Sequence, residues 1–143
     1  MSEPAIQACY KAVKGALDSG DEIWGTKVRA SIAKADTAYP YLIYFWSGGG
    51  EINSIINDDA EFRIAVKVVS DKMAEAMTGK RRISDLLNNK GEQEEVTGYL
   101  DGGTDWTILT CSEEDTIYLA ERLADTKVVY HVGAYFRISM QAV

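Results

Sequence analysis

The chain is poor in the residues on which many catalytic and metal sites depend. Its 143 residues include one histidine, two cysteines and two prolines. A single histidine excludes a site built on several imidazoles, and the two cysteines are too far apart in sequence for the usual zinc-ligand spacing. We therefore expect no metal site and no catalytic residues, a structural hydrogen bond for His131, and buried thiols without a disulfide for Cys9 and Cys111.

Long apolar runs are also missing. No segment approaches the roughly 20 apolar residues that a membrane-spanning helix needs, and residues 1–4 lack a signal-peptide pattern. Apolar residues make up 46% of the chain and charged residues 26%, which is typical of a compact domain. A chain of this length fills one core but not two. These features predict a single domain over residues 1–143, made in the cytoplasm, with no membrane partner.

Acidic and basic residues are segregated along the chain, whose formal net charge is -7. Residues 91–125 hold ten acidic residues and one basic residue, whereas residues 61–90 hold seven basic and four acidic residues. An acidic chain binds nucleic acid poorly, because affinity for a duplex comes mainly from neutralised phosphates. The segregation favours docking between copies of the chain, and ion pairing within one chain explains it equally well.

Hydrophobic periodicity predicts an α+β fold, with a mixed, mostly antiparallel sheet packed against an N-terminal helix and a central helix. The expected order is α-β-β-β-α-β-β-β-β. The first helix places Ile6, Tyr10, Val13 and Leu17 on one face. The first three strands are expected at residues 27–33, 41–46 and 61–69.

The second half of the chain is expected to begin with a helix and to continue with strands. The central helix follows Ser70-Asp71 with Met73, Met77, Ile83 and Leu87 inward. Gly79 interrupts it, so the segment forms either one helix or two short helices. Strands are expected at residues 96–100, 106–111 and 127–140. Residues 116–126 fit a helix or a strand, and we favour a strand that ends in a turn at residues 124–126.

Three consecutive glycines follow the strand Tyr41–Trp46, whose two faces are both apolar, as in a central strand. A phosphate-binding loop of the nucleotide-hydrolysing type has a lysine directly after its glycines, but here the next lysine is Lys67. We therefore expect no nucleotide and no other cofactor. We interpret residues 47–60 as a long, mobile hairpin loop. Its residues Ser47, Gly48, Gly49, Gly50 and Glu51 are candidates for an assembly arm that contacts protein.

Two further features are candidates for a subunit interface. Lys80, Arg81 and Arg82 form the only basic cluster, which is either an exposed helix end or a docking patch for the acidic third of a neighbouring subunit. Trp46 lies beside the expected loop and is a candidate interface anchor. Physical reasoning from the residues alone predicts an interaction module rather than an enzyme.

Three segments carry a family resemblance: KVRASIAKADTAYPYLIYF (residues 27–45), RIAVKVVSDKMAEAM (63–77) and YHVGAYFRISM (130–140). With the N-terminal helix, they make nearly the whole chain resemble the tail-terminator, or tail-completion, proteins of long-tailed phages. This group includes the lambda-type terminators. The last segment is the most specific of the three.

This resemblance implies a non-enzymatic protein of the virion, assembled in the host cytoplasm and located at the head-proximal end of the tail. Such proteins form a ring, typically of six subunits, that caps the tail tube and stops its polymerisation. The implied partners are the major tail tube protein and a head-completion or connector protein, and DNA passes through the lumen without specific binding. Alternatives are a head-completion or neck connector protein and a small nucleotide-binding enzyme.

Overall fold

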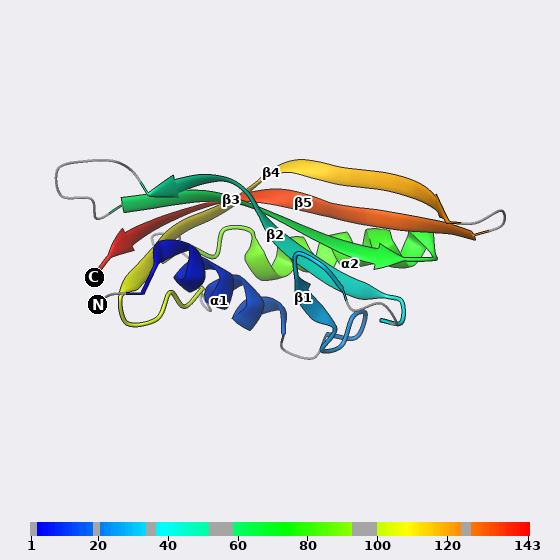
Figure 1. The fold of residues 1–143 in the computed structure, drawn as a ribbon, viewed down its shortest axis with the longest axis horizontal. Coiled ribbons are helices and arrows are strands. Elements are labelled where there is room, and N and C mark those ends of the chain that lie inside the picture. Colours follow the sequence, from blue (N-terminus) through cyan, green and yellow to red (C-terminus); the bar gives the residue numbers. More distant parts are fainter. Residues whose placement is uncertain (1–2, 19–20, 34–36, 52–58, 93–99, 124–126) are drawn as a thin grey trace.

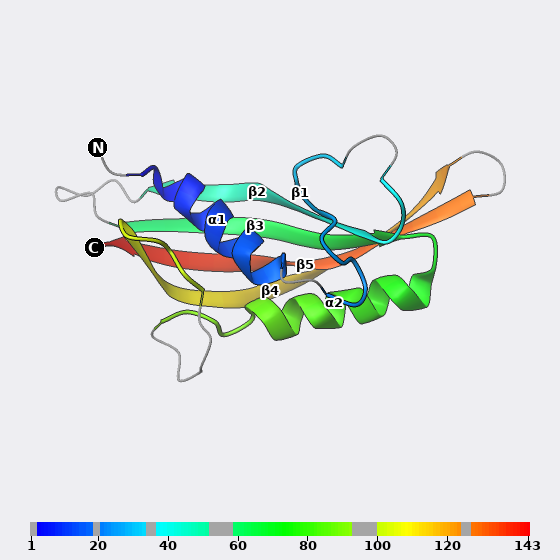
Figure 2. The same ribbon diagram turned by 90° about the horizontal axis from the view of Figure 1, so that it is seen from below.

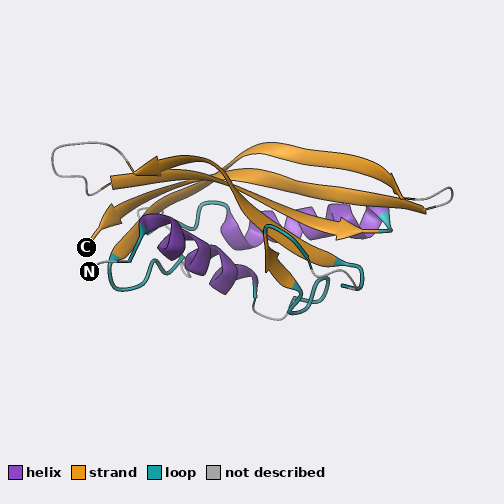
Figure 3. Ribbon diagram, viewed as in Figure 1, coloured by secondary structure: helices purple, strands orange, loops and turns teal. Residues whose placement is uncertain are grey.

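The described residues fold into an α+β structure with one five-stranded sheet and two helices (Figures 1 and 3). The predicted class is confirmed, with five strands among the described residues where seven were expected. The computed structural model describes residues 3–18, 21–33, 37–51, 59–92, 100–123 and 127–143. In chain order the elements are α1 (Ala5–Leu17), β1 (Val28–Ala30), β2 (Tyr41–Glu51), β3 (Asp59–Ser70), α2 (Met73–Leu87), β4 (Trp106–Leu123) and β5 (Lys127–Ala142).

The sheet has the strand order β1-β2-β3-β5-β4. Only β1 and β2 are parallel, and the other three pairs are antiparallel. Both helices lie against the same face of the elongated, twisted sheet (Figure 2). No helix of the described residues lies on the opposite face. This one-sided arrangement explains why β3 and β5 alternate so regularly between apolar and polar residues.

The main core lies between the sheet and the helices. Val13 and Leu17 of α1 are fully buried there, together with Trp24, whose Nε1 donates a hydrogen bond of 2.9 Å to the Leu17 carbonyl oxygen. Alternating apolar residues of β3 and β5 also lie in this core and are buried: Phe62, Ile64, Val66, Val68, Phe136, Ile138 and Met140. The strands expected at residues 61–69 and 127–140 are confirmed and lie within β3 and β5.

The prediction for the central helix was partly wrong. α2 is one continuous helix, and Met73 and Met77 are 44% and 48% exposed. The buried face instead contains Ala76, Gly79, Ile83 and Leu87. A Cβ atom at Gly79 would lie 2.7 Å from Cγ2 of Val68, so glycine lets the helix approach β3 rather than ending it.

The later strands also differ from the prediction. Residues 106–111 and 116–123 belong to one long strand, β4, with register shifts between Ile108 and Thr110 and between Glu113 and Thr116. The preference for strand over helix is thus confirmed for residues 116–123. The turn expected at 124–126 lies outside the described residues, as does the strand expected at 96–100 apart from its last residue, Leu100, which is buried. Near the N-terminus, the strand expected at 27–33 is limited to β1.

Candidate assembly surface

The three glycines lie inside β2 and form part of its ladder with β3. Residues 48–50 pair in turn with residues 63, 62 and 61, after a register shift at Ser47. Gly49 has a φ of +84°, and a Cβ atom there would lie 2.1 Å from the Glu61 carbonyl oxygen. Both constraints favour glycine at this position. The glycines therefore extend the strand.

The predicted hairpin loop at residues 47–60 is accordingly corrected. β2 continues to Glu51 and β3 begins at Asp59, so the residues proposed for an assembly arm (Ser47, Gly48, Gly49, Gly50 and Glu51) are strand residues. Consecutive glycines show no alternation of apolar and polar side chains, so the sequence pattern did not reveal that β2 continues to Glu51. Residues 52–58 lie outside the described residues. The part that residues 47–51 take in assembly stays a prediction.

Trp46 lies beside the glycines, at an apolar hollow between α1 and β2. Its side chain is 47% exposed, and its ring packs edge-to-face on Phe62 with centroids 5.7 Å apart. Its Nε1 donates to the Gly48 carbonyl oxygen at 2.6 Å, and its backbone N–H donates to the Tyr10 hydroxyl at 2.7 Å. The hollow has a volume of about 370 Å³ and is lined by Ile6, Gln7, Tyr10, Lys11, Lys14, Tyr44 and Trp46. An exposed ring held by its own hydrogen bond and by an edge-to-face contact is typical of an interface anchor.

The basic cluster lies on α2, and two of its three side chains form ion pairs within the chain. Lys80 Nζ lies 3.0 Å from Oε2 of Glu113, and Arg82 Nε lies 3.0 Å from Oδ2 of the buried Asp21. Arg81 is exposed and forms no ion pair with any described residue. Of the three, Arg81 is therefore the side chain available to a partner, and the interface assignment stays a prediction.

A second group of ion pairs lies on the helix-free face of the sheet. Arg137 bonds to Glu61 and Glu114, each at 2.9 Å, and Arg63 lies 3.4 Å from Glu114 and 3.2 Å from Asp115. The contacts of Arg63, like that of Lys80 with Glu113, join the basic segment 61–90 to the acidic segment 91–125 within one molecule. Ion pairing within the chain thus accounts for Glu113, Glu114 and Asp115 of the acidic segment.

Glu113 of β4 accepts hydrogen bonds from two side chains of α2, Ser84 and Lys80. Its burial acts to raise its pKa, but the hydrogen bonds from Ser84 and Lys80 and the charge of Lys80 outweigh burial, so the pKa lies below its ordinary value. Glu113 therefore stays ionised and fixes the bulged part of β4 against α2.

His131 forms the hydrogen bond that the sequence predicts. Its Nε2 lies 3.1 Å from Oε2 of Glu121. Burial, and next the charge of Lys67, lower the pKa of His131 despite the opposing effect of Glu121. Cys9 and Cys111 are buried and form no disulfide, as expected, and burial raises the pKa of Cys9 to about 12.

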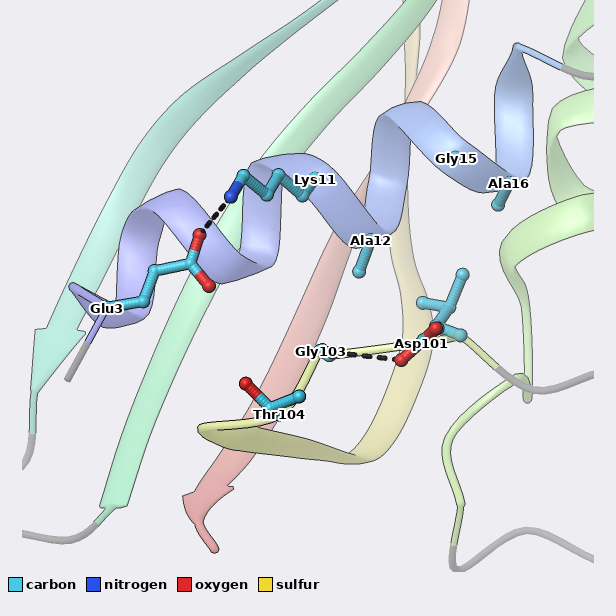
Figure 4. Close-up of a pocket in the computed structure, with 10 residues that line it drawn as sticks. Glu3, Lys11, Ala12, Gly15, Ala16, Asp101, Gly103 and Thr104 are labelled. Carbon is cyan, nitrogen blue, oxygen red and sulfur yellow. Dashed lines mark hydrogen bonds and ion pairs between the residues drawn. The ribbon is translucent and has the colours of Figure 1, made fainter.

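A further hollow of about 640 Å³ lies between α1 and residues 100–104 (Figure 4). Lys11 forms an ion pair of 2.7 Å with Glu3 there, and the Gly103 N–H donates to Oδ1 of Asp101 at 2.9 Å. Sequence reasoning missed this hollow because its walls are distant in the chain. Its only cation is already neutralised, so its lining indicates no reaction.

Searches for two other kinds of site gave negative results in the described parts of the chain. No group of three or more histidine, cysteine, aspartate or glutamate side chains there could hold a metal ion. Nor does any described helix have the length and apolar character needed to cross a membrane.

Comparison with known proteins shows the fold. No family model matches the chain, and no curated protein is significantly similar to it in sequence. Among solved structures, the chain is similar to one from the "Virion of native gene transfer agent (GTA) particle", with a TM-score of 0.66 and 18% sequence identity. The match covers 98% of this chain and 99% of that chain. The two chains therefore share one fold from end to end.

Proposed function

We propose that this chain is a structural protein of a phage-like virion, and that it acts as a tail terminator. The observation that carries the proposal is the end-to-end fold match with a component of a gene transfer agent particle. The match spans 98% of this chain and 99% of that chain. The resemblance of residues 27–45, 63–77 and 130–140 to tail terminators points to the same class of protein.

In this role the chain forms a ring, of six subunits by the family resemblance, on the last ring of the tail tube. Closing a ring requires a head-to-tail contact in which each subunit offers two different surfaces. Trp46 with its apolar hollow and the exposed Arg81 are the candidate contacts. The ring stops tube polymerisation on one side and offers the head-completion protein a surface on the other.

The net charge of -7 suits a ring through which DNA moves. A polyanion gains affinity where a protein neutralises its phosphates, and an acidic lumen offers few such contacts. We propose that DNA passes through the ring without specific binding, and that the chain performs no catalysis.

Binding to the two candidate partners tests this function. The purified chain should co-sediment with purified tail tubes of its own phage and appear as a ring at one end of each tube. The matched control is a tube already capped in the particle, which should bind no further chain. Failure to bind open tubes would overturn the proposal, and binding to the head connector alone would favour the alternative of a neck protein.

A further inference from the structure

The outer backbone edges of β2 and β4 each have hydrogen-bonding partners along one half of the strand, which we call the covered half. Along the other half, which we call the open half, no described residue pairs with the edge. On β2, the parallel strand β1 pairs with Leu42–Tyr44, and the Tyr10 hydroxyl accepts from the Trp46 N–H. Beyond Trp46, residues 47–51 pair only with β3 among the described elements. The glycine-rich end of β2 is therefore an open sheet edge.

The same division occurs on β4, at the opposite edge of the sheet. Backbone N–H groups of Asn89 and Glu92 donate to the carbonyl oxygens of Cys111 and Ile108, each at 2.7 Å. The Asn88 side chain accepts from the Glu113 N–H at 3.0 Å. Beyond the part of β4 that accepts or donates these hydrogen bonds, residues Thr116–Leu123 pair with β5 alone among the described segments.

The open half of β4 exposes three apolar side chains beside the charged Glu121 and Arg122. Tyr118, Leu119 and Leu123 are 53%, 51% and 38% exposed. Natural proteins protect such edges with charges, prolines or short strands, because a long apolar edge invites pairing with another chain. On the other edge, Trp46 is 47% exposed beside the glycines. Apolar side chains thus lie at both open halves.

The two open halves cannot meet within one molecule. Gly48 is level with Ser112 across the sheet, through the register pairs of Arg63 and Arg137. Leu119 lies a further seven residues along β4 (119 − 112), which is about 23 Å of strand. Figure 1 shows the two open ends at opposite ends of the molecule.

Between two copies the halves are complementary. β2 and β4 run antiparallel to each other, as the three antiparallel pairings between them require. A second copy in the same orientation, displaced along the strands, brings its glycine-rich edge beside the open edge of β4. The displacement also keeps β1 and residues 88–92 out of the contact, because both lie on the covered halves.

We infer that copies of this chain join head to tail by pairing the β4 edge (Thr116–Leu123) of one subunit with the β2 edge (Ser47–Glu51) of the next. This inference rests on the proposed function for its ring, and it assigns the contact that closes that ring. The glycines contribute a backbone edge with no side chains in the way. A heterologous contact of this kind forms closed rings when the rotation between subunits is suitable.

Cross-linking of the purified chain alone tests the inference. The double variant Ser47→Cys/Leu119→Cys carries one new thiol on each proposed edge, and both positions are exposed. A short bismaleimide spans about two residues of register in either direction. The native Cys9 and Cys111 do not compete, because both are buried. The control Ser47→Cys/Thr104→Cys moves the second thiol to an exposed position before β4 begins, far along the chain from Leu119.

We expect the double variant to give a ladder of covalent oligomers that ends at the ring size, while each single variant and the control stay mostly monomeric. A double variant that cross-links no better than the control, even at millimolar concentration, would overturn the inference. The result is separable from the proposed function. Cross-linked rings that ignore tail tubes contradict the terminator role alone, and tube binding without the cross-link contradicts this contact alone.

Discussion

Lys80 of α2 and Glu113 of β4 form an ion pair of 3.0 Å, with 24% and 23% of their side chains exposed. The basic helix and the acidic strand thus neutralise each other at this point within one molecule. The pair holds the bulged part of β4 against α2. Its loss is therefore expected to lower the stability of the single chain, whether or not the chain assembles.

We predict that Lys80→Glu lowers the free energy of unfolding by about 1–3 kcal/mol, because it replaces a charged hydrogen bond with like-charge repulsion. Urea titration measures this change. The charge swap Lys80→Glu/Glu113→Lys should recover part of the loss. If Lys80→Glu is as stable as the natural chain, the pair does not support the fold.

Arg81 permits a clean test of the predicted docking patch. It is exposed and makes no ion pair with the described residues, so Arg81→Glu should change stability by less than about 0.5 kcal/mol. If the patch contacts a neighbouring subunit, the variant should assemble more weakly, and its deficit should shrink as salt screens the interaction. Sedimentation at low and high salt measures both effects. Unchanged assembly at low salt would remove Arg81 from the interface.

Gly49 and its neighbour Gly50 provide a test and a matched control for the strand conformation of the glycines. Gly49→Ala should destabilise the fold by roughly 1–3 kcal/mol, because of the positive φ and the close Glu61 carbonyl. A Cβ atom at Gly50 meets nothing within 4 Å, so Gly50→Ala should be tolerated. Thermal unfolding of the two variants distinguishes a strand from the loop that the sequence suggested. Equal melting temperatures would favour the loop.

Stability should fall as the pH is lowered. The folded-state pKa values of Glu113 and His131 both lie below their ordinary values of 4.5 and 6.5. In both cases the unfolded chain binds the proton more readily than the folded chain. Each group's contribution to the free energy of unfolding is therefore fully present above its ordinary pKa and is lost as the pH falls through its folded-state pKa. Burial and the charge of Lys67 cause the His131 shift, against the effect of Glu121.

Urea titration at a series of pH values measures this dependence. The His131→Gln variant should lose less stability than the natural chain between about pH 7 and pH 5, because it removes the group that takes up a proton there. Glu113→Gln is expected to flatten the decline at lower pH. A natural chain that becomes more stable on acidification from neutral pH would contradict both assignments.

The sequence predicted those elements whose side chains alternate or repeat clearly. β3 and β5 pack one face against helices and carry charged residues on the other, where Val69 and Val129 form a small second cluster with Ile43. Their period is therefore visible in residues such as Ile64 and Arg63. The extension of β2 was not visible, because glycines 48–50 carry no side-chain pattern. Met73 and Met77 were expected inward for their hydrophobicity, but close packing of α2 on Val68 selects the small residues Ala76 and Gly79.

The candidate contact surfaces were still harder to predict. Trp46 was identified from its position before the glycines, and it does lie exposed beside an apolar hollow. The open sheet edges depend on strand order, with β4 outermost beside β5, and on the backbone bonds from residues 88–92. Neither can be read from local patterning, since register and order are set by contacts between segments distant in the chain.

The length of tails made without this chain tests the central claim most directly. In particles from a host that lacks the gene, measured by electron microscopy, the terminator role predicts tubes of irregular and excessive length without attached heads. Supplying the natural chain should restore one uniform length and head attachment. Tails of normal length joined to heads in its absence would contradict the account.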